Sequence, residues 1–269
     1  MTLELRELDE SVALVTGGGQ GLGFAFVEVL VKNGAYVSLL DINEDNGNKA
    51  ISRLKTKFET SDKVLFIKCD VTNENEFEDA FKNTIKKFGK INIVINNAGI
   101  MTKYITSWEQ AIDINFKAVV RGTILGLKYI ENKVDNMSAV INIGSITGLS
   151  SSILPIYQST KRAVVEFTKS IGCVYNAREN GNHIRIMCIC PGPTFDGLDI
   201  EGKKKLEHKM KVFITSGEEN PDEKRKILVQ SSEYIQASFL YVMKNGKTGE
   251  VWISENEESP RLSKLNNFY

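Results

Sequence analysis

A tyrosine, a lysine and a serine in this chain have the spacing needed for proton transfer. Tyr157 and Lys161 are four residues apart, so they share one face if their segment is helical. A phenol has a pKa of about 10, and a nearby ammonium group lowers it by stabilising the phenolate. Ser145, twelve residues before Tyr157, could hold a substrate oxygen beside the phenol. These residues could take the proton of an alcohol while a hydride leaves its carbon for a nicotinamide.

A glycine-rich run near the start of the chain suits a dinucleotide. The run is TGGGQGLG, residues 16–23, and it lies between an apolar segment and a helical one. Gly17, Gly21 and Gly23 let the backbone turn tightly and approach a pyrophosphate at the N-terminus of the helix. Gln20 and Leu22 would lie at the same junction. A tight turn without a ligand is the alternative, and the position between a strand and a helix favours the dinucleotide.

One acidic residue, Asp41, indicates which dinucleotide should bind. Asp41 ends the second predicted strand, 20 residues after Gly21. A carboxylate at this place accepts hydrogen bonds from the hydroxyls of the adenosine ribose and repels a 2′-phosphate. The next residue, Ile42, supplies no cation that could offset this repulsion. The pattern therefore favours NAD over NADP, with a merely solvated Asp41 as the weaker alternative.

Further cofactor contacts are expected where later strands end, since ligands bind at that edge of a parallel sheet. Asp70 could meet the edge of the adenine or could cap the helix that follows. The small residues of the NNAG segment at 96–99 would let a cofactor lie against the backbone, although a plain turn has the same composition. The residues predicted to bind the cofactor are Gly17, Gln20, Gly21, Leu22, Gly23, Asp41, Ile42, Cys69, Asp70, Val71, Asn97, Ala98, Gly99, Tyr157, Lys161, Pro191, Gly192 and Thr194.

Strands and helices alternate along most of the chain. Patterns predict strands at 12–17, 35–42, 63–70, 91–99, 138–145, 183–192 and 249–254, and helices at 21–33, 45–60, 73–88, 107–133, 156–178 and 221–243. Near-continuous runs of Val, Ile and Leu are typical of strands covered on both faces, and the alternation indicates parallel βαβ units. We predict an α/β fold in which residues 1–269 form a single doubly wound Rossmann domain. Its sheet would be seven-stranded and mostly parallel, with helices on both faces.

Composition argues against several other classes of protein. Lys plus Arg and Asp plus Glu both number 34, and this zero net charge offers no electrostatic footprint for nucleic acid or a membrane surface. The first ten residues lack the apolar core of a signal peptide. The cysteines, Cys69, Cys173, Cys188 and Cys190, have neither C-x-x-C nor zinc spacing. We expect no bound metal and a cytoplasmic location, with Cys188 and Cys190 as reduced thiols on one face of a strand.

Taken together, these motifs resemble those of the short-chain dehydrogenase/reductase family, from about residue 10 to residue 193. The resemblance implies that Asn115, within a bent helix, holds a water linked to Lys161. It also implies a homodimer or homotetramer built from the helices at 107–133 and 156–178. The matching features are the TGGGQGLG run, Asp41, Asp70-Val71, NNAG at 96–99, Asn115, Ser145, Tyr157, Lys161 and Pro191-Gly192. The predicted catalytic residues are therefore Asn115, Ser145, Tyr157 and Lys161.

Within that family the chain is most similar to NAD-dependent hydroxyprostaglandin dehydrogenases and insect alcohol dehydrogenases. The segments LFIKCDVTNENEFEDAF, INIVINNAGI, RGTILGLKYI and IRIMCICPG carry this similarity. The chain departs from the prostaglandin enzymes at Leu154, where they have a glutamine that bonds a substrate hydroxyl. It also has Asp196 where the family usually has a threonine near the nicotinamide amide, and Thr194 could take that role instead.

The substrate side is expected to be apolar. Residues from about 195 to 220 should form a lid, and the predicted pocket residues are Ser145, Leu154, Tyr157, Phe195 and Leu198. These expectations describe an oxidoreductase that transfers a hydride between NAD and a lipophilic secondary alcohol or ketone, such as a hydroxy fatty acid, steroid or terpenoid. A carbonyl reductase or epimerase with the same substrates is an alternative. A catalytically idle NAD-binding protein is another, favoured by Asp196 and opposed by the complete catalytic set.

Overall fold

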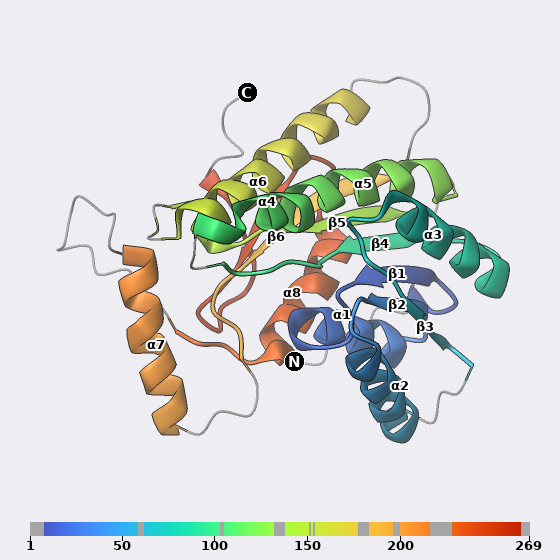
Figure 1. Cartoon of the computed structure of the whole chain (residues 1–269), viewed down its shortest axis with the longest axis horizontal. Coiled ribbons are helices and arrows are strands. Elements are labelled where there is room, and N and C mark those ends of the chain that lie inside the picture. The colour runs from blue at the N-terminus through green and yellow to red at the C-terminus, as the bar shows by residue number, and fades with distance from the viewer. Residues whose placement is uncertain are drawn as a thin grey trace.

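One β-sheet runs through the part of the chain that the computed structural model describes. That part comprises residues 8–58, 62–102, 105–131, 138–150, 152, 154–176, 183–195, 200–215 and 228–264. Within it the strand order is β3-β2-β1-β4-β5-β6-β7-β8 (Figure 1). The strands are β1 (Val12–Thr16), β2 (Tyr36–Asp41), β3 (Val64–Lys68), β4 (Ile93–Asn96), β5 (Ala139–Ile143), β6 (Arg185–Pro191), β7 (Val251–Ser254) and β8 (Arg261–Leu262).

The first seven strands pair in parallel, as the sequence predicts. They lie in the predicted places and are shorter than predicted at their ends. β8 was not predicted: it pairs antiparallel with β7 through Trp252 and Leu262, and through Ile253 and Arg261. A two-residue strand in a polar segment is too short to have a periodic pattern. Arg261 also forms an ion pair with the buried Glu255, which holds β8 against the sheet.

Helices cover both faces of the sheet (Figure 1). One face carries α3, α4, α5 and α6, and the other carries α1, α2 and α8, while α7 lies apart from both layers (Figure 1). Among the helices that are described, none has the length and apolar character required to cross a membrane. The helices are α1 (Gly21–Lys32), α2 (Glu44–Phe58), α3 (Glu74–Phe88), α4 (Trp108–Ile112), α5 (Ala118–Tyr129), α6 (Pro155–Asn176), α7 (Ile200–Thr215) and α8 (Ser232–Asn245).

Burial on both faces explains the continuous apolar runs of the central strands. In β1, Ala13 and Val15 pack into the cluster on the α1 and α8 side, whereas Leu14 packs into the cluster beneath α3 and α5. Successive side chains of a strand point to opposite faces, so each face of β1 requires its own apolar residues. The doubly wound α/β fold that the sequence predicts is confirmed.

Two predicted helices differ from the structure. The helix predicted over 107–133 consists of α4, a π-helical turn (Asp113–Lys117) and α5, and it ends at Tyr129. It ends there because Ile130 is buried in the core and the next backbone N–H donates to the Ile91 carbonyl in front of β4. The helix predicted over 221–243 begins at Ser232 in α8, because the backbone of Gln230 pairs with Pro193 and Phe195 in the segment after β6. Residues 221–227 lie outside the described part.

The strand order places a crevice at one edge of the sheet. From β1, the chain proceeds outward through β2 to β3 and then returns to the other side of β1 with β4. In such sheets the loops after the two central strands separate, and ligands bind outside the carboxyl ends of these strands.

Candidate active site

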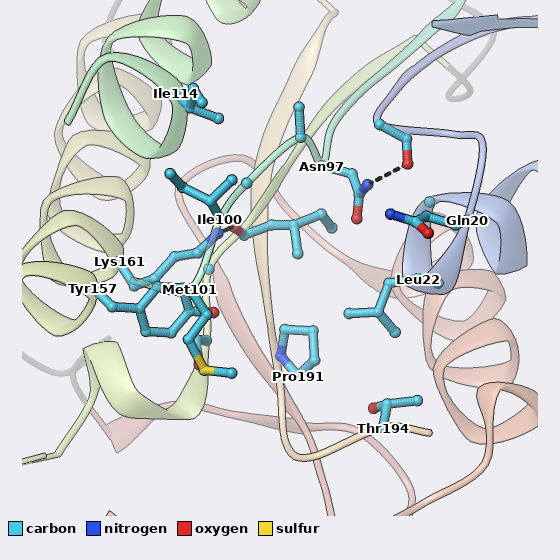
Figure 2. A pocket seen from close by; sticks show the side chains of 18 of the residues that line it. Gln20, Leu22, Asn97, Ile100, Met101, Ile114, Tyr157, Lys161, Pro191 and Thr194 are labelled. Atoms are coloured by element: carbon cyan, nitrogen blue, oxygen red, sulfur yellow. Dashed lines mark hydrogen bonds between the residues drawn. The ribbon is translucent and has the colours of Figure 1, made fainter. Parts of the chain in front are cut away.

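A cavity of about 570 Å³ lies at the carboxyl ends of β1, β4, β5 and β6. Every residue that the sequence predicts for the cofactor lines this cavity, and so do four of the five predicted pocket residues. The fifth, Leu198, falls outside the described residues. Figure 2 shows Tyr157 and Lys161 on one side of the cavity and Gln20 and Leu22 on the other. Residues distant in sequence thus meet around one space.

The glycine-rich run brings α1 close to the end of β1. Gly17 and Gly21 have positive φ angles of 63° and 55°, a conformation that favours glycine. A Cβ atom at Gly23 would overlap the carbonyl oxygen of Gly17, so only glycine allows the helix to start there. No side chain caps α1, and its first turn contains no acidic residue. An uncapped helix N-terminus facing a cavity fits the pyrophosphate of a dinucleotide.

Asp41 faces the cavity and also holds the glycine-rich run. Its Oδ2 atom accepts a hydrogen bond of 2.9 Å from the Gly19 N–H, and its Oδ1 atom accepts one of 2.9 Å from the Asn43 N–H. A Cβ atom at Gly19 would come within 2.7 Å of that Oδ2 atom. The carboxylate is therefore fixed in orientation, and each of its oxygens keeps capacity for a ribose hydroxyl. Ile42 is 62% exposed at the cavity rim.

The loop after β3 is held by its own side chains and by α5. Asp70 accepts hydrogen bonds from the N–H and the hydroxyl of Thr72, while Asn73 caps α3. Asp70 is therefore not the cap of that helix, which was the alternative left open by the sequence. Arg121 of α5 donates to the carbonyls of Val71 and Thr72, at 3.3 Å and 3.0 Å. No sequence signal marks Arg121, because its partners are backbone atoms about 50 residues away.

Asn97 joins the end of β4 to the end of β1. Its backbone N–H donates to the Thr16 hydroxyl at 2.9 Å, and its side-chain amide donates to the Thr16 and Gly17 carbonyls at 2.9 Å and 3.2 Å. Figure 2 shows one hydrogen bond of this side-chain amide as a dashed line. A Cβ atom at Gly17 would lie 3.0 Å from the Cα atom of Ala98. The NNAG segment is thus more than a turn, since it fixes the floor of the cavity.

The predicted acid/base residues lie together where β5 meets α6. Lys161 donates from Nζ to the Ile143 carbonyl at 2.8 Å, and Nζ lies 5.8 Å from the centre of the Tyr157 ring. Burial raises the pKa of Tyr157, and a hydrogen bond with the Ser145 hydroxyl opposes that rise. Burial lowers the pKa of Lys161 to about 8. A charged lysine beside a phenol that burial keeps protonated is suited to stabilising the phenolate once it forms.

Asn115 is fully buried in the π-helical turn and does not line the cavity. Its side chain exchanges two hydrogen bonds with the Ile100 backbone, at 2.7 Å and 2.8 Å, and donates to the Thr160 hydroxyl at 3.2 Å. A Cβ atom at Gly99 would lie 3.3 Å from the Asn115 amide oxygen and 3.5 Å from the Lys161 Nζ atom. Asn115 thus positions the segment after β4, and its water-mediated link to Lys161 stays a prediction.

Two thiols lie close to Lys161. Cys188 and Cys190 share one face of β6, as predicted, and their sulfur atoms are 3.8 Å apart. The hydrogen bond with Cys188 and burial raise the pKa of Cys190 well above its usual value, which makes it an unreactive thiol. A Cβ atom at Gly144 would collide with both sulfurs, so the strand end carrying Ser145 rests directly on them. Among the described residues no group of three or more His, Cys, Asp or Glu could hold a metal ion.

Apolar side chains from several elements form the other end of the cavity. Leu154 is buried, Phe195 is 58% exposed, and Leu206 and Met210 reach the cavity from α7. Met101 follows the NNAG segment and lies near Tyr157 in Figure 2. Leu206 and Met210 were not predicted, although an apolar pair four residues apart in a charged helix is a signal for one buried face. Other lining residues that were not predicted are Ile100, Met101, Ile114, Ile143, Gly144, Ile146, Thr147 and Pro193.

Gln230 joins the two chain segments that flank α7. Its backbone pairs with Pro193 and Phe195, so the segments before and after α7 lie side by side. Its buried side-chain amide donates to the Thr194 hydroxyl at 3.2 Å and to the Ser254 carbonyl at 2.9 Å. This side chain therefore fixes Thr194, a predicted cofactor contact, against the end of β7.

Comparisons with known proteins all find similarity to dehydrogenases. A family model described as "short chain dehydrogenase" matches residues 11–205. The chain is 39% identical over 183 residues to a 15-hydroxyprostaglandin dehydrogenase [NAD(+)] from Rattus norvegicus, covering 67% of each protein. It is 30% identical over 212 residues to a 3beta-hydroxysteroid dehydrogenase 2 from Eggerthella lenta, covering 76% of this chain and 78% of that protein.

The fold is also similar to a solved structure. A mutant of a short-chain dehydrogenase/reductase from Serratia marcescens superposes with a TM-score of 0.71 at 22% identity. The superposition covers 92% of this chain and 97% of the Serratia protein. At this identity the likeness concerns the arrangement of strands and helices.

Proposed function

Because the chain belongs to the short-chain dehydrogenase/reductase family, we propose that it is an oxidoreductase that transfers a hydride between NAD and a lipophilic secondary alcohol or its ketone. The observation that carries this proposal is the placement of Tyr157, Ser145 and Lys161 on one cavity with the uncapped end of α1. Proton transfer and dinucleotide binding then take place in a single space.

The chain's own groups fit NAD along the whole cavity. The N-terminus of α1 binds the pyrophosphate, Asp41 binds the adenosine ribose and excludes a 2′-phosphate, and Lys161 binds the nicotinamide ribose. Thr194, held by Gln230, lies where it can meet the nicotinamide amide. When bound, NAD supplies the hydride acceptor for the alcohol carbon.

Tyr157 accepts the proton of the alcohol, and the side chains around it assist this transfer. The phenolate of Tyr157 takes the hydroxyl proton of the alcohol, and the Lys161 ammonium group stabilises that phenolate. The Ser145 hydroxyl donates a hydrogen bond to the substrate oxygen while that oxygen becomes a carbonyl. The Ile143 carbonyl accepts from Lys161 and keeps its ammonium group beneath the phenol.

The substrate is proposed to be lipophilic, of the hydroxy fatty acid, steroid or terpenoid type. Leu154, Phe195, Leu206 and Met210 supply an apolar part of the cavity lining that can bind such a substrate. The names of two relatives specify a hydroxyprostaglandin and a hydroxysteroid as substrates, which are both lipophilic secondary alcohols. Asp41 favours NAD, and therefore favours oxidation in a compartment where this cofactor is mostly oxidised.

The proposal extends to the organisation of the protein. Residues 1–269 form a single domain whose segment from about 195 to 220, including α7, is a lid over the substrate. The protein is a cytoplasmic homodimer or homotetramer, in keeping with four free cysteines and with large apolar side chains exposed on α4, α5 and α6. These side chains are Trp108, Ile112, Ile124 and Val174.

The test is a spectroscopic assay of reduced nicotinamide formation with a panel of lipophilic secondary alcohols. Wild-type protein should reduce NAD and prefer it to NADP. Tyr157→Phe should lower kcat by roughly 10²- to 10⁴-fold, the range for loss of a general acid/base, while NAD binding is retained. Tight NAD binding without turnover of any alcohol would overturn the enzymatic proposal, and a preference for NADP would overturn the role of Asp41.

A further inference from the structure

The catalytic serine accepts two hydrogen bonds from one neighbouring residue. The backbone N–H of Thr147 donates to the Ser145 Oγ atom at 3.2 Å, and the Thr147 hydroxyl donates to the same atom at 2.9 Å. Ser145 begins the short 3₁₀ helix Ile146–Gly148, so the first of these bonds is a cap. The second comes from the side chain and is not needed for the cap. Both residues are buried at the cavity wall, Ser145 with 8% and Thr147 with 7% of its surface exposed.

The hydroxyl of a serine has two acceptor lone pairs and one proton. The two donors of Thr147 occupy the acceptor directions of Ser145. Only the proton of the Ser145 hydroxyl is left for a further hydrogen bond, so Ser145 can act toward other groups only as a donor. Tyr157 lines the same cavity as Ser145, and hydrogen bonding with the Ser145 side chain lowers the pKa of Tyr157 against the rise that burial causes.

We propose that Thr147 is a positioning residue that makes Ser145 an obligatory hydrogen-bond donor, toward Tyr157 in the free protein and toward the substrate oxygen once an alcohol is bound. This inference rests on the proposed function of the site. The hydroxyls of Thr147, Ser145 and Tyr157 then form a chain in which each donor polarises the next, and such chains strengthen cooperatively.

The direction of donation matters for the chemistry. An alcohol oxygen and the carbonyl oxygen formed from it can both accept a hydrogen bond from Ser145, so a donor serves the substrate throughout the reaction. A serine free to rotate could instead accept a hydrogen bond from the substrate hydroxyl, and it would then compete with Tyr157 for that hydroxyl as a hydrogen-bond donor. The Thr147 hydroxyl removes this competing arrangement.

The matched variants Thr147→Val and Thr147→Ser test the proposal. Valine has the shape of threonine and keeps the backbone bond to Ser145, whereas serine also keeps the hydroxyl. We expect Thr147→Val to lower kcat about 10-fold, the value of one hydrogen bond, and Thr147→Ser to stay within about two-fold of wild type. The thermal midpoints of both variants should be similar, because Thr147→Val loses a buried hydrogen bond and Thr147→Ser a buried methyl group, and each change costs about 1 kcal/mol.

Two readouts separate positioning from a general structural role. Weaker donation from Ser145 raises the pKa of Tyr157, so the kcat/KM profile for oxidation should move to higher pH in Thr147→Val and not in Thr147→Ser. A tyrosinate absorbance titration, corrected with Tyr157→Phe, should show the same rise in the free protein. This titration reports on the three residues even if no alcohol is turned over, so it distinguishes failure of this inference from failure of the proposed function.

A double-mutant cycle with Ser145→Ala provides the decisive comparison. If Thr147 acts through Ser145, adding Thr147→Val to Ser145→Ala should cause no further loss of kcat. Additive losses would show that the Thr147 hydroxyl contacts the substrate directly and would overturn the proposal. An unchanged tyrosinate titration in Thr147→Val would overturn it as well.

Discussion

The two ends of the cavity are built by different means. At the cofactor end, backbone atoms of different segments are in close contact: Gly17 lies against Ala98, and Gly23 lies against Gly17. At the lid end, one backbone pairing at Gln230 joins the segments beside α7, and side chains supply further contacts, chiefly the Gln230 amide and the ion pair between Lys203 and Glu257. Where the backbones of two segments are in contact, there is no room for a side chain, so the glycines cannot be replaced. Contacts between side chains can be exchanged, so the lid end can change its substrate while the cofactor end stays fixed.

The largest effect should come from Gly23→Ala, which places a methyl group on the Gly17 carbonyl oxygen. Overpacking of this kind costs roughly 1–3 kcal/mol. Since about 1.4 kcal/mol is tenfold in an equilibrium constant, we expect the Kd for NAD to rise about 10- to 100-fold, measured by calorimetry. Gly89→Ala is the matched control: Gly89 ends α3 and does not line the cavity, no atom lies within 4 Å of its added carbon, and only its φ of 85° is unfavourable. Equal Kd values for Gly23→Ala and wild type would refute the idea of a rigid cofactor end.

Gln230→Met should have the next largest effect. Methionine keeps the length of glutamine and loses the hydrogen bonds to Thr194 and Ser254. Buried polar partners left without a bond cost about 1–3 kcal/mol, so the urea midpoint should fall. We expect KM for the alcohol to rise more than KM for NAD, because the segments flanking α7 separate. A rise confined to NAD would place Gln230 at the cofactor end instead.

Arg121→Met should weaken NAD only modestly, by a few-fold in KM, because Arg121 acts through the backbone of Val71 and Thr72. Nicotinamide mononucleotide lacks the adenosine, so its KM should be unchanged in the variant. Lys117→Met is a suitable control, since this lysine is exposed on the adjoining turn and pairs with Asp113. A similar loss with both nucleotides would indicate a general distortion of α5.

The smallest effect should come from Lys203→Met. Its ion pair with Glu257 is 2.6 Å long and partly exposed, and exposed ion pairs contribute little to stability. We expect the thermal midpoint to stay within experimental error and KM for the alcohol to change less than about two-fold. The wild-type KM should depend weakly on salt and the variant KM should not. A large change in KM would mean that this pair, rather than Gln230, holds the lid.

The same contrast decides which features could be predicted from the sequence. The glycines of the run, Asp41, and the Tyr157 and Lys161 pair are local patterns, since each follows from a strand end, a helix start or a spacing of four. All of them line the cavity in the structure, apart from the middle glycines of the run, Gly18 and Gly19. The parallel strands were equally predictable, because strands buried on both faces leave continuous apolar runs.

What sequence reasoning missed depends on contacts between distant segments. Arg121 and Gln230 bond backbone atoms that lie far away in the sequence, and no spacing reveals such partners. Thr147 is two residues from Ser145, but its role follows only from the direction of a hydroxyl bond. The start of α8 was placed too early because the Pro-Asp pair at residue 221 resembles a helix start, whereas the backbone of Gln230 pairs with the segment after β6.

β8 has a consequence for how the protein behaves at high concentration. Without it, β7 would be the outermost strand at this side of the sheet, with unpaired N–H and carbonyl groups along apolar residues such as Trp252 and Ile253. Such an edge is a template for pairing with another chain and hence for aggregation. The two residues of β8, fastened by Arg261 to the buried Glu255, cover that template. A chain shortened before β8 should keep its catalytic residues in place and lose its solubility.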